Sequence, residues 1–182
     1  MLLLVLGVLL WSFSHLMKRV TPGLRSAMPD TVGKLVVTGM SLAAVALMVA
    51  GYRAAEVVVL WDAPEFFRGI NNLLMLAAVF LVGLGFSRGA LRGRIRHPML
   101  TSVMVWAVAH LMVNGDLASV VLFGGMLVWA LADWALINRA QPVWVQPAPG
   151  PWRNDLIYGV IALAIFAAIA GVHRWLGVNP FG

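Results

Sequence analysis

The fold is decided by residues 98–138, PMLTSVMVWAVAHLMVNGDLASVVLFGGMLVWALADWALIN, where two apolar runs are separated only by Asn114-Gly115-Asp116. A helix needs about 20 largely apolar residues to cross the hydrocarbon core of a bilayer. Each run approaches this length, and three residues between them leave room only for a tight turn. The stretch therefore predicts a hairpin of two antiparallel membrane helices.

The rest of the chain has the same character. Of 182 residues, 62% are hydrophobic and 11% are charged, whereas a soluble domain has about 25% charged residues. The excess apolar surface needs lipid. We therefore predict an all-α polytopic membrane helix bundle of about six transmembrane helices, at residues 2–20, 34–53 (with a possible extension through 57–60), 71–87, 98–114, 116–138 and 156–176.

The positive charges are unevenly divided between alternate connections. Of the thirteen Lys and Arg residues, three (Arg53, Arg68 and Arg174) fall on one side of the bundle and the other ten on the opposite side. By the positive-inside rule, both termini face outward, which in a bacterial inner membrane is the periplasm. The first span lacks a basic start and a cleavage site, so we interpret it as a retained helix rather than a secretion signal.

The composition also limits the partners and cofactors. The net charge is +6, but the basic residues are interleaved with apolar spans, which fits anionic lipid head groups and not a nucleic acid. The chain has no cysteine and four histidines, which excludes disulfides and iron–sulfur ligation by thiolates. A ligand-based cofactor site would have to be built mainly from histidine.

Four prolines between residues 141 and 155 predict an extended connector after the fifth helix. The chain accordingly divides into a transmembrane bundle at 1–140, a proline-rich connector at 141–155 and an additional C-terminal transmembrane helix at 156–182. We expect this last helix to pack on the outside of the bundle, without lining its central pocket.

His15 and His110 lie inside apolar spans, where ionisable residues are costly and usually functional. Trp11 and Trp106 each precede a histidine by four residues, on the same helical face, and Asn114 continues the second stripe, where it could hydrogen-bond an imidazole or a substrate. Facing histidines in helical bundles hold haem iron. Three interpretations remain open: haem ligation, structural hydrogen bonding across a helix interface, and a proton relay or another metal.

The remaining ionisable groups are expected at the interfaces. His97 precedes Pro98 at the cytoplasmic entry of a span, and His173 lies beside Arg174 and Trp175. Asp133 is expected in an ion pair with Arg139 or with the basic loop at residues 88–96. His15 and His110 differ in expected depth by about 8 Å at about 1.5 Å per residue. If helix tilt does not absorb this offset, His15 with His97, or His110 with His173, is better matched in depth.

Several motifs resemble the signature of the NnrU family, between residue 1 and about residue 140. The resemblance is carried by Phe13-Ser14-His15-Leu16, Leu60-Trp61-Asp62-Ala63-Pro64, Arg96-His97-Pro98-Met99-Leu100, Trp106-Ala107-Val108-Ala109-His110-Leu111, Asn114-Gly115-Asp116-Leu117-Ala118-Ser119 and Phe123-Gly124-Gly125. The resemblance implies a bacterial inner-membrane protein linked to nitrite and nitric oxide reduction in denitrification.

The same domain resembles 15-cis-zeta-carotene isomerase, a haem b enzyme of plants and algae. By motif, the haem-ligating histidines of that enzyme correspond to His15 and His110, and His97 is also shared. The resemblance thus implies haem b, but leaves the catalytic residues and the substrate unknown. Three functions stay open: a haem-dependent isomerase of a lipophilic polyene, a redox or nitric oxide-binding module, and a non-enzymatic assembly factor for nitrogen-oxide respiratory proteins.

Overall fold

The computed structural model describes residues 1–181, and its regular structure is helical throughout this range. The elements are α1 (Leu2–Val20), α2 (Pro22–Ser26), α3 (Asp30–Arg53), α4 (Phe66–Phe86), η1 (Ala90–Gly93), α5 (Pro98–Val113), α6 (Leu117–Ser119), η2 (Val120–Gly124), α7 (Gly125–Ala140) and α8 (Trp152–Trp175). The predicted all-α membrane bundle is confirmed.

Six spans are formed by α1, α3, α4, α5, the continuous helix α6–η2–α7, and α8. Five of them are long and apolar enough to cross a bilayer, whereas α5 has 16 residues. At about 1.5 Å per residue, α5 is roughly 24 Å long, somewhat short of the hydrocarbon core of about 30 Å. The predicted hairpin between α5 and α7 is present, with its turn at residues 114–116.

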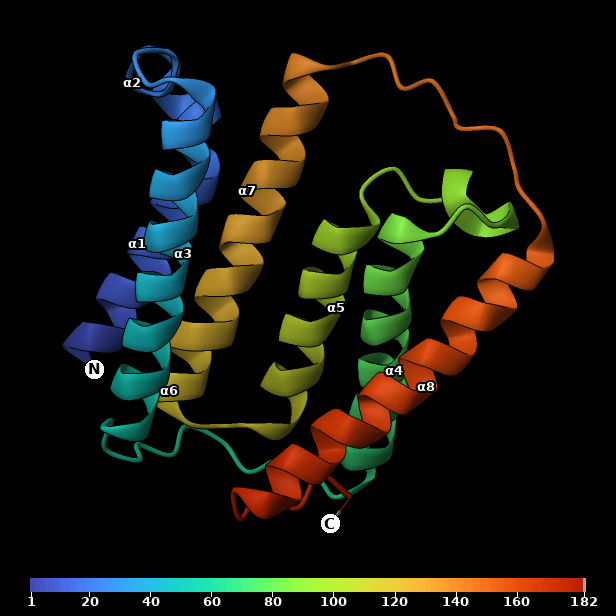
Figure 1. Cartoon of the computed structure of the whole chain (residues 1–182). Helices are drawn as coiled ribbons and strands as arrows, with labels where there is room; N and C mark the ends of the chain where they lie inside the picture. The colour runs from blue at the N-terminus through green and yellow to red at the C-terminus, as the bar shows by residue number, and fades with distance from the viewer. Residues whose placement is uncertain (182) are drawn as a thin grey trace.

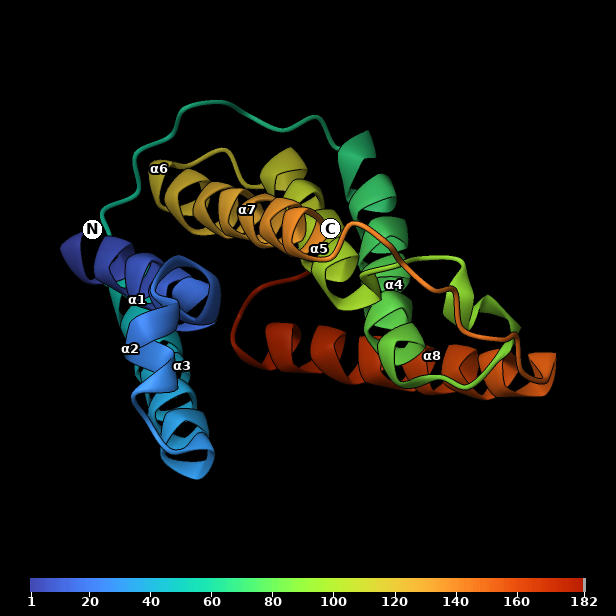
Figure 2. The ribbon, with the colours of Figure 1, turned by 90° about the horizontal axis from the view of Figure 1, so that it is seen from above.

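The helices form two groups joined by a central helix. The antiparallel pair α1–α3 lies on one side of α6–η2–α7, and α5, α4 and α8 follow on the other side (Figures 1 and 2). The turn at α2, the η1 loop and the 141–151 connector gather at one end of the bundle, which we call the basic end. The 114–116 turn and both termini lie at the opposite end, which we call the hairpin end.

The predicted extension of the second span through residues 57–60 is wrong. The segment 54–65 leaves α3 and crosses the hairpin end as extended chain, which we call the strap. The backbone N–H of Leu60 donates to the carbonyl of Gly115 at 2.7 Å, and the N–H of Leu117 donates to Val58 at 2.9 Å. Backbone pairing with the 114–116 turn therefore satisfies polar groups that a helix would have satisfied internally.

Gly115 has no side chain and therefore allows the strap to lie against the 114–116 turn. A Cβ atom at Gly115 would stand 1.8 Å from the carbonyl oxygen of Trp61, so any side chain there would push the strap away. The sequence pattern around residues 57–60 is apolar, but nothing local in it indicates a pairing with a turn more than 50 residues later.

Residues 141–151 have no regular secondary structure, and α8 begins at Trp152, four residues before the predicted start of the last span. It packs on α4 and on η1. The Asp155 carboxylate accepts hydrogen bonds from Ser87 Oγ and from the backbone N–H groups of Ala90 and Leu91, at 2.7 to 3.3 Å. This anchor fixes the start of α8 to the loop that follows α4. Its position on α4 agrees with the expected place on the outside of the bundle.

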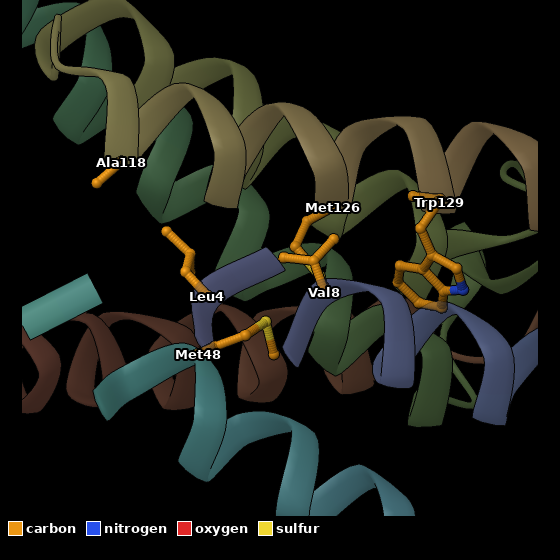
Figure 3. Packing of buried hydrophobic residues seen from close by; sticks show 7 residues of the cluster. Leu4, Val8, Met48, Ala118, Met126 and Trp129 are labelled. Atoms are coloured by element: carbon orange, nitrogen blue, oxygen red, sulfur yellow. The ribbon is translucent and has the colours of Figure 1, made fainter. Parts of the chain in front are cut away.

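The apolar core lies where α1, α3 and the central helix meet. Leu4 and Val8 of α1 face Ala118, Met126 and Trp129 of the central helix, with Met48 of α3 behind them (Figure 3). Helices approach closely in lipid through small residues. Gly51 of α3 provides such a contact, because a Cβ atom there would lie 2.2 Å from the backbone nitrogen of Leu4.

Gly51→Ala should therefore destabilise the fold by about 1–3 kcal/mol, because the added methyl group needs space that the α1 backbone occupies. Gly39 lies in the same helix with open space around it, so Gly39→Ala is the matched control and should be neutral or stabilising by up to about 1 kcal/mol. Unfolding in a graded detergent mixture, followed by circular dichroism, measures both. Equal stabilities of the two variants would contradict this packing.

Candidate functional site

His15 lies in a cluster of aromatic rings between α1 and α7. The Trp11 ring stacks on the imidazole at 4.1 Å between centroids, and Trp129 of α7 meets it edge-on at 5.2 Å. The two tryptophans are themselves 5.5 Å apart in a T-shaped pair. The predicted Trp11–His15 stripe therefore exists, and α7 supplies the third ring.

The hydrogen bonds of His15 fix its tautomer. Nδ1 lies 2.9 Å from the carbonyl oxygen of Trp11 and 3.0 Å from Ser14 Oγ. A carbonyl oxygen can only accept, so Nδ1 carries the proton and donates to it. The remaining nitrogen, Nε2, then has a free lone pair, which is the form in which a histidine binds a metal with its other nitrogen oriented by a hydrogen bond.

His110 repeats this arrangement on the other flank of the central helix. Its Nδ1 lies 2.9 Å from the carbonyl oxygen of Trp106. The imidazole stacks on Phe123 at 4.5 Å, and Trp106 meets Phe123 edge-on at 5.0 Å. Phe123 lies in η2, a π-helical turn within the central helix. The sequence pattern places this ring in a family motif but does not predict its contact with His110.

The structure does not bring His15 and His110 into one cluster. Each packs against its own ring of the central helix, Trp129 for His15 and Phe123 for His110. These two ring positions are six residues apart, or about 9 Å along the helix. The depth offset expected from the sequence is thus present in the fold.

The other two histidines differ from each other. His97 Nε2 lies 3.0 Å from Asn138 Oδ1 at the basic end, so this nitrogen has a protein partner. His173 donates from Nδ1 to the carbonyl of Ile169 at 2.8 Å, as His15 and His110 do to theirs.

Asn114 does not contact the His110 imidazole. Its Nδ2 donates to the backbone carbonyl of His110 at 2.9 Å, and the backbone N–H of Asn114 donates to the same carbonyl at the C-terminal end of α5. The expected hydrogen bond to the ring is therefore absent in this structure. The contact to a substrate remains a prediction.

Asp133 forms the expected ion pair, but with a different partner. Its Oδ1 lies 3.0 Å from Arg19 Nη1 of α1, not beside Arg139 or the basic loop. The N–H of the guanidinium is not aligned with this oxygen, so the contact is an ion pair without a directed hydrogen bond. The partner was missed because the depths of α1 and α7 relative to each other are set by packing.

Two buried indole nitrogens in the His15 cluster have no hydrogen-bond partner among the described residues: Trp11 Nε1 and Trp129 Nε1. Trp129 is 5% exposed. The T-shaped contact between the rings can satisfy one N–H against an aromatic face. At least one donor then remains unpaired, and buried polar groups are nearly always paired. An oxygen-bearing group placed beside these rings would satisfy it.

The described residues thus define a polytopic helical membrane protein with two histidine–aromatic clusters inside the bundle. The chain belongs to the NnrU protein family, whose family model matches residues 3–180. The match includes the connector and α8, so it extends beyond residue 140, where the motifs recognised in the sequence end. Comparisons with curated proteins and with solved structures find no significant match.

Arg19→Gln should destabilise the protein by about 2 kcal/mol, because it leaves Asp133 without a cation at a site where the Asp133 side chain is 11% exposed. The expected loss of stability is smaller than for a fully buried ion pair, since the Arg19 side chain is 30% exposed. The double variant Arg19→Gln/Asp133→Asn should recover most of the loss, because no charge remains to be compensated.

Lys34→Gln is the control, because the Lys34–Asp30 pair is exposed on both sides and should have no measurable effect. Thermal unfolding in detergent compares the variants. A double variant no more stable than Arg19→Gln would show that the ion pair does not compensate a buried charge.

Proposed function

We propose that this membrane protein binds haem b within the bundle, with His15 and His110 as the iron ligands and Trp11 and Trp106 beside the macrocycle. The observation that carries the proposal is the shared state of the two imidazoles. Each donates from Nδ1 to the carbonyl four residues earlier and keeps Nε2 free. Each also lies against aromatic rings suited to the apolar faces of a porphyrin.

The unpaired donors beside His15 fit the same group. Haem carries two carboxylates, and the indole N–H groups of Trp11 and Trp129 lack acceptors. Arg19 lies at the next turn of α1, with its charge already balanced by Asp133. An oxygen acceptor near His15 would therefore complete the hydrogen bonding of this cluster.

In this structure His15 and His110 lie in separate clusters about 9 Å apart along the central helix, so binding of one iron by both requires α1 and α5 to shift relative to each other. His173 is the alternative partner of His110, because its Nδ1 donates to a backbone carbonyl in the same way and its Nε2 is the remaining nitrogen. His97 is a weaker alternative, since Asn138 already holds its Nε2. Replacing each histidine in turn shows which pair of histidines binds the iron.

We place the activity in nitrite and nitric oxide metabolism, as the NnrU resemblance implies. Haem held by these histidines would supply an iron able to exchange electrons or to bind a small ligand. The protein residues hold the imidazoles in one tautomer and exclude water with aromatic rings. The alternatives are a haem-dependent cis–trans isomerase of a carotenoid-like polyene, supported by the same histidine motifs, and a non-enzymatic assembly factor.

His15→Ala and His110→Ala should each remove or strongly shift the Soret band of the purified protein, because each takes away one ligand of the iron. His173→Ala is the matched control and should leave the band unchanged. Reduced-minus-oxidised absorption spectra in detergent measure all three. An intact band in both His15→Ala and His110→Ala would eliminate this site, and loss only in His110→Ala and His173→Ala would move it to that pair.

The location we propose is the bacterial inner membrane, with the hairpin end in the periplasm and the basic end in the cytoplasm. The support is the clustering of basic residues at the connections of one end. The chain has no cysteine, so single cysteines report topology without background.

Val57→Cys on the strap should react with a membrane-impermeant thiol reagent added to intact cells, and Arg92→Cys in the η1 loop should not. Both positions are exposed on the protein surface, so the side of the membrane on which each cysteine lies decides whether the reagent reaches it. Permeabilised cells give the control, in which both cysteines react. The opposite pattern in intact cells would reverse the topology.

A further inference from the structure

The hairpin end contains an open hollow of about 350 Å³. It is lined by the strap, the start of α4 and the 114–116 turn, and its polar side chains are Asp62, Arg68, Asn114 and Asp116. Two of the motifs that carry the NnrU resemblance, residues 60–64 and residues 114–119, meet here through the backbone pairing of the strap. In the proposed topology this hollow faces the periplasm and is open to water.

A chain of hydrogen bonds leads from this hollow into the bundle. Ser119 Oγ lies 2.6 Å from Asp116 Oδ2 and 2.8 Å from Tyr52 Oη. Ser119 is completely buried. An ionised carboxylate can only accept, so Ser119 donates to Asp116, and Tyr52 must then donate to Ser119. All the hydrogen bonds of the chain therefore point in the same direction, towards the hollow.

The inner end of this chain lies at the His110 cluster. The Tyr52 ring meets Phe123 edge-on at 6.5 Å, and Phe123 stacks on His110 at 4.5 Å. Phe123 belongs to the π-helical turn η2, which begins directly after Ser119. Such turns occur mostly as single interruptions of α-helices, frequently at functional sites.

Helix capping explains only part of this arrangement. Asp116 caps α6 by accepting from the backbone N–H of Ser119 through Oδ1 at 2.9 Å. That contact needs neither the serine hydroxyl nor the tyrosine. The second carboxylate oxygen, the hydroxyl and the phenol form a separate connection between the hollow and α3.

We propose that Asp116, Ser119 and Tyr52 are a proton path that connects the outward hollow with the Tyr52 phenol beside the His110 cluster. Tyr52 passes its phenol proton to Ser119 Oγ while the Ser119 proton passes to the Asp116 carboxylate, which releases a proton to water in the hollow and leaves Tyr52 as tyrosinate. The reverse sequence, from water through Asp116 and Ser119, restores the phenol. The path rests on the proposed function only for its setting, beside the cluster in which His110 would hold haem iron.

The other charged and titratable groups near the path are few in the described chain. Asp62 and Arg68 share the hollow with Asp116, and Arg53 follows Tyr52 in sequence. His110 lies beyond Phe123. Asp62 is the useful control among them, because it lines the same hollow but forms no part of the chain.

The rate at which the Tyr52 phenol ionises measures proton transfer along the path, and this measurement does not require bound haem. The chain has two tyrosines, and Tyr158→Phe removes the other, which lies on α8 and donates only to the carbonyl of Phe86. The full-length chain in this background is reconstituted into lipid vesicles with the hairpin end outward. A stopped-flow jump of the external solution to alkaline pH then removes the phenol proton. The rise of the near-ultraviolet absorption of tyrosinate measures the rate of this ionisation.

Ser119→Ala and Asp116→Asn should each slow this ionisation by at least about tenfold, because positioned proton-transfer groups contribute about 10²- to 10⁴-fold. Asp62→Asn should leave the rate unchanged. Asp116→Asn keeps an acceptor oxygen for the Ser119 N–H, so it preserves the cap, and near-ultraviolet circular dichroism verifies the fold of every variant.

Equal rates in the parent, Ser119→Ala and Asp116→Asn would overturn the path, as would an equal slowing in Asp62→Asn. The outcome is independent of the cofactor. A protein without a Soret band in which Ser119→Ala still slows Tyr52 would overturn the proposed haem function and support the path. An intact Soret band with unaffected Tyr52 kinetics would overturn the path alone.

Discussion

The His15 cluster depends on the close contact of α1 with the central helix at Val8 and Gly125. A Cβ atom at Gly125 would lie 2.7 Å from Val8 Cγ1, so only glycine lets the two helices approach this far. Trp129 lies one turn further along the central helix and consequently reaches Trp11 and His15. At this contact distance Arg19 can also pair with Asp133. Close packing of small residues thus sets the positions of the polar groups.

The sequence predicted the spans well because lipid imposes a length and a composition on each helix. It also indicated the stripes of Trp11 with His15 and of Trp106 with His110, since residues four apart share a helical face. The rings contributed by another helix were harder to find. Trp129 and Phe123 reach the histidines through the relative rotation of helices, and the π-helical turn η2 that changes this rotation leaves no mark in the apolar pattern.

Polar contacts between residues far apart in the sequence explain where the structure differs from the other sequence-based predictions. Residues 57–60 of the strap are predicted as a possible helical extension because they are apolar, yet the backbone of this segment pairs with the 114–116 turn. The partner of Asp133 was sought nearby in sequence and is found on α1. The family match continues to residue 180. In this part of the chain, the carboxylate of Asp155 holds α8 to the backbone of the η1 loop.

The strap and the ion pair together give the bundle unequal ends. At the hairpin end, covalent chain and backbone hydrogen bonds join the α1–α3 pair to the remaining helices. At the basic end, the polar link between α1 and α7 in the described chain is the single ion pair of Arg19 with Asp133. The α1–α3 pair is therefore tied to the rest of the bundle by covalent chain at the hairpin end alone. Loss of the Arg19–Asp133 ion pair would leave apolar packing as the remaining contact between α1 and α7 towards the basic end.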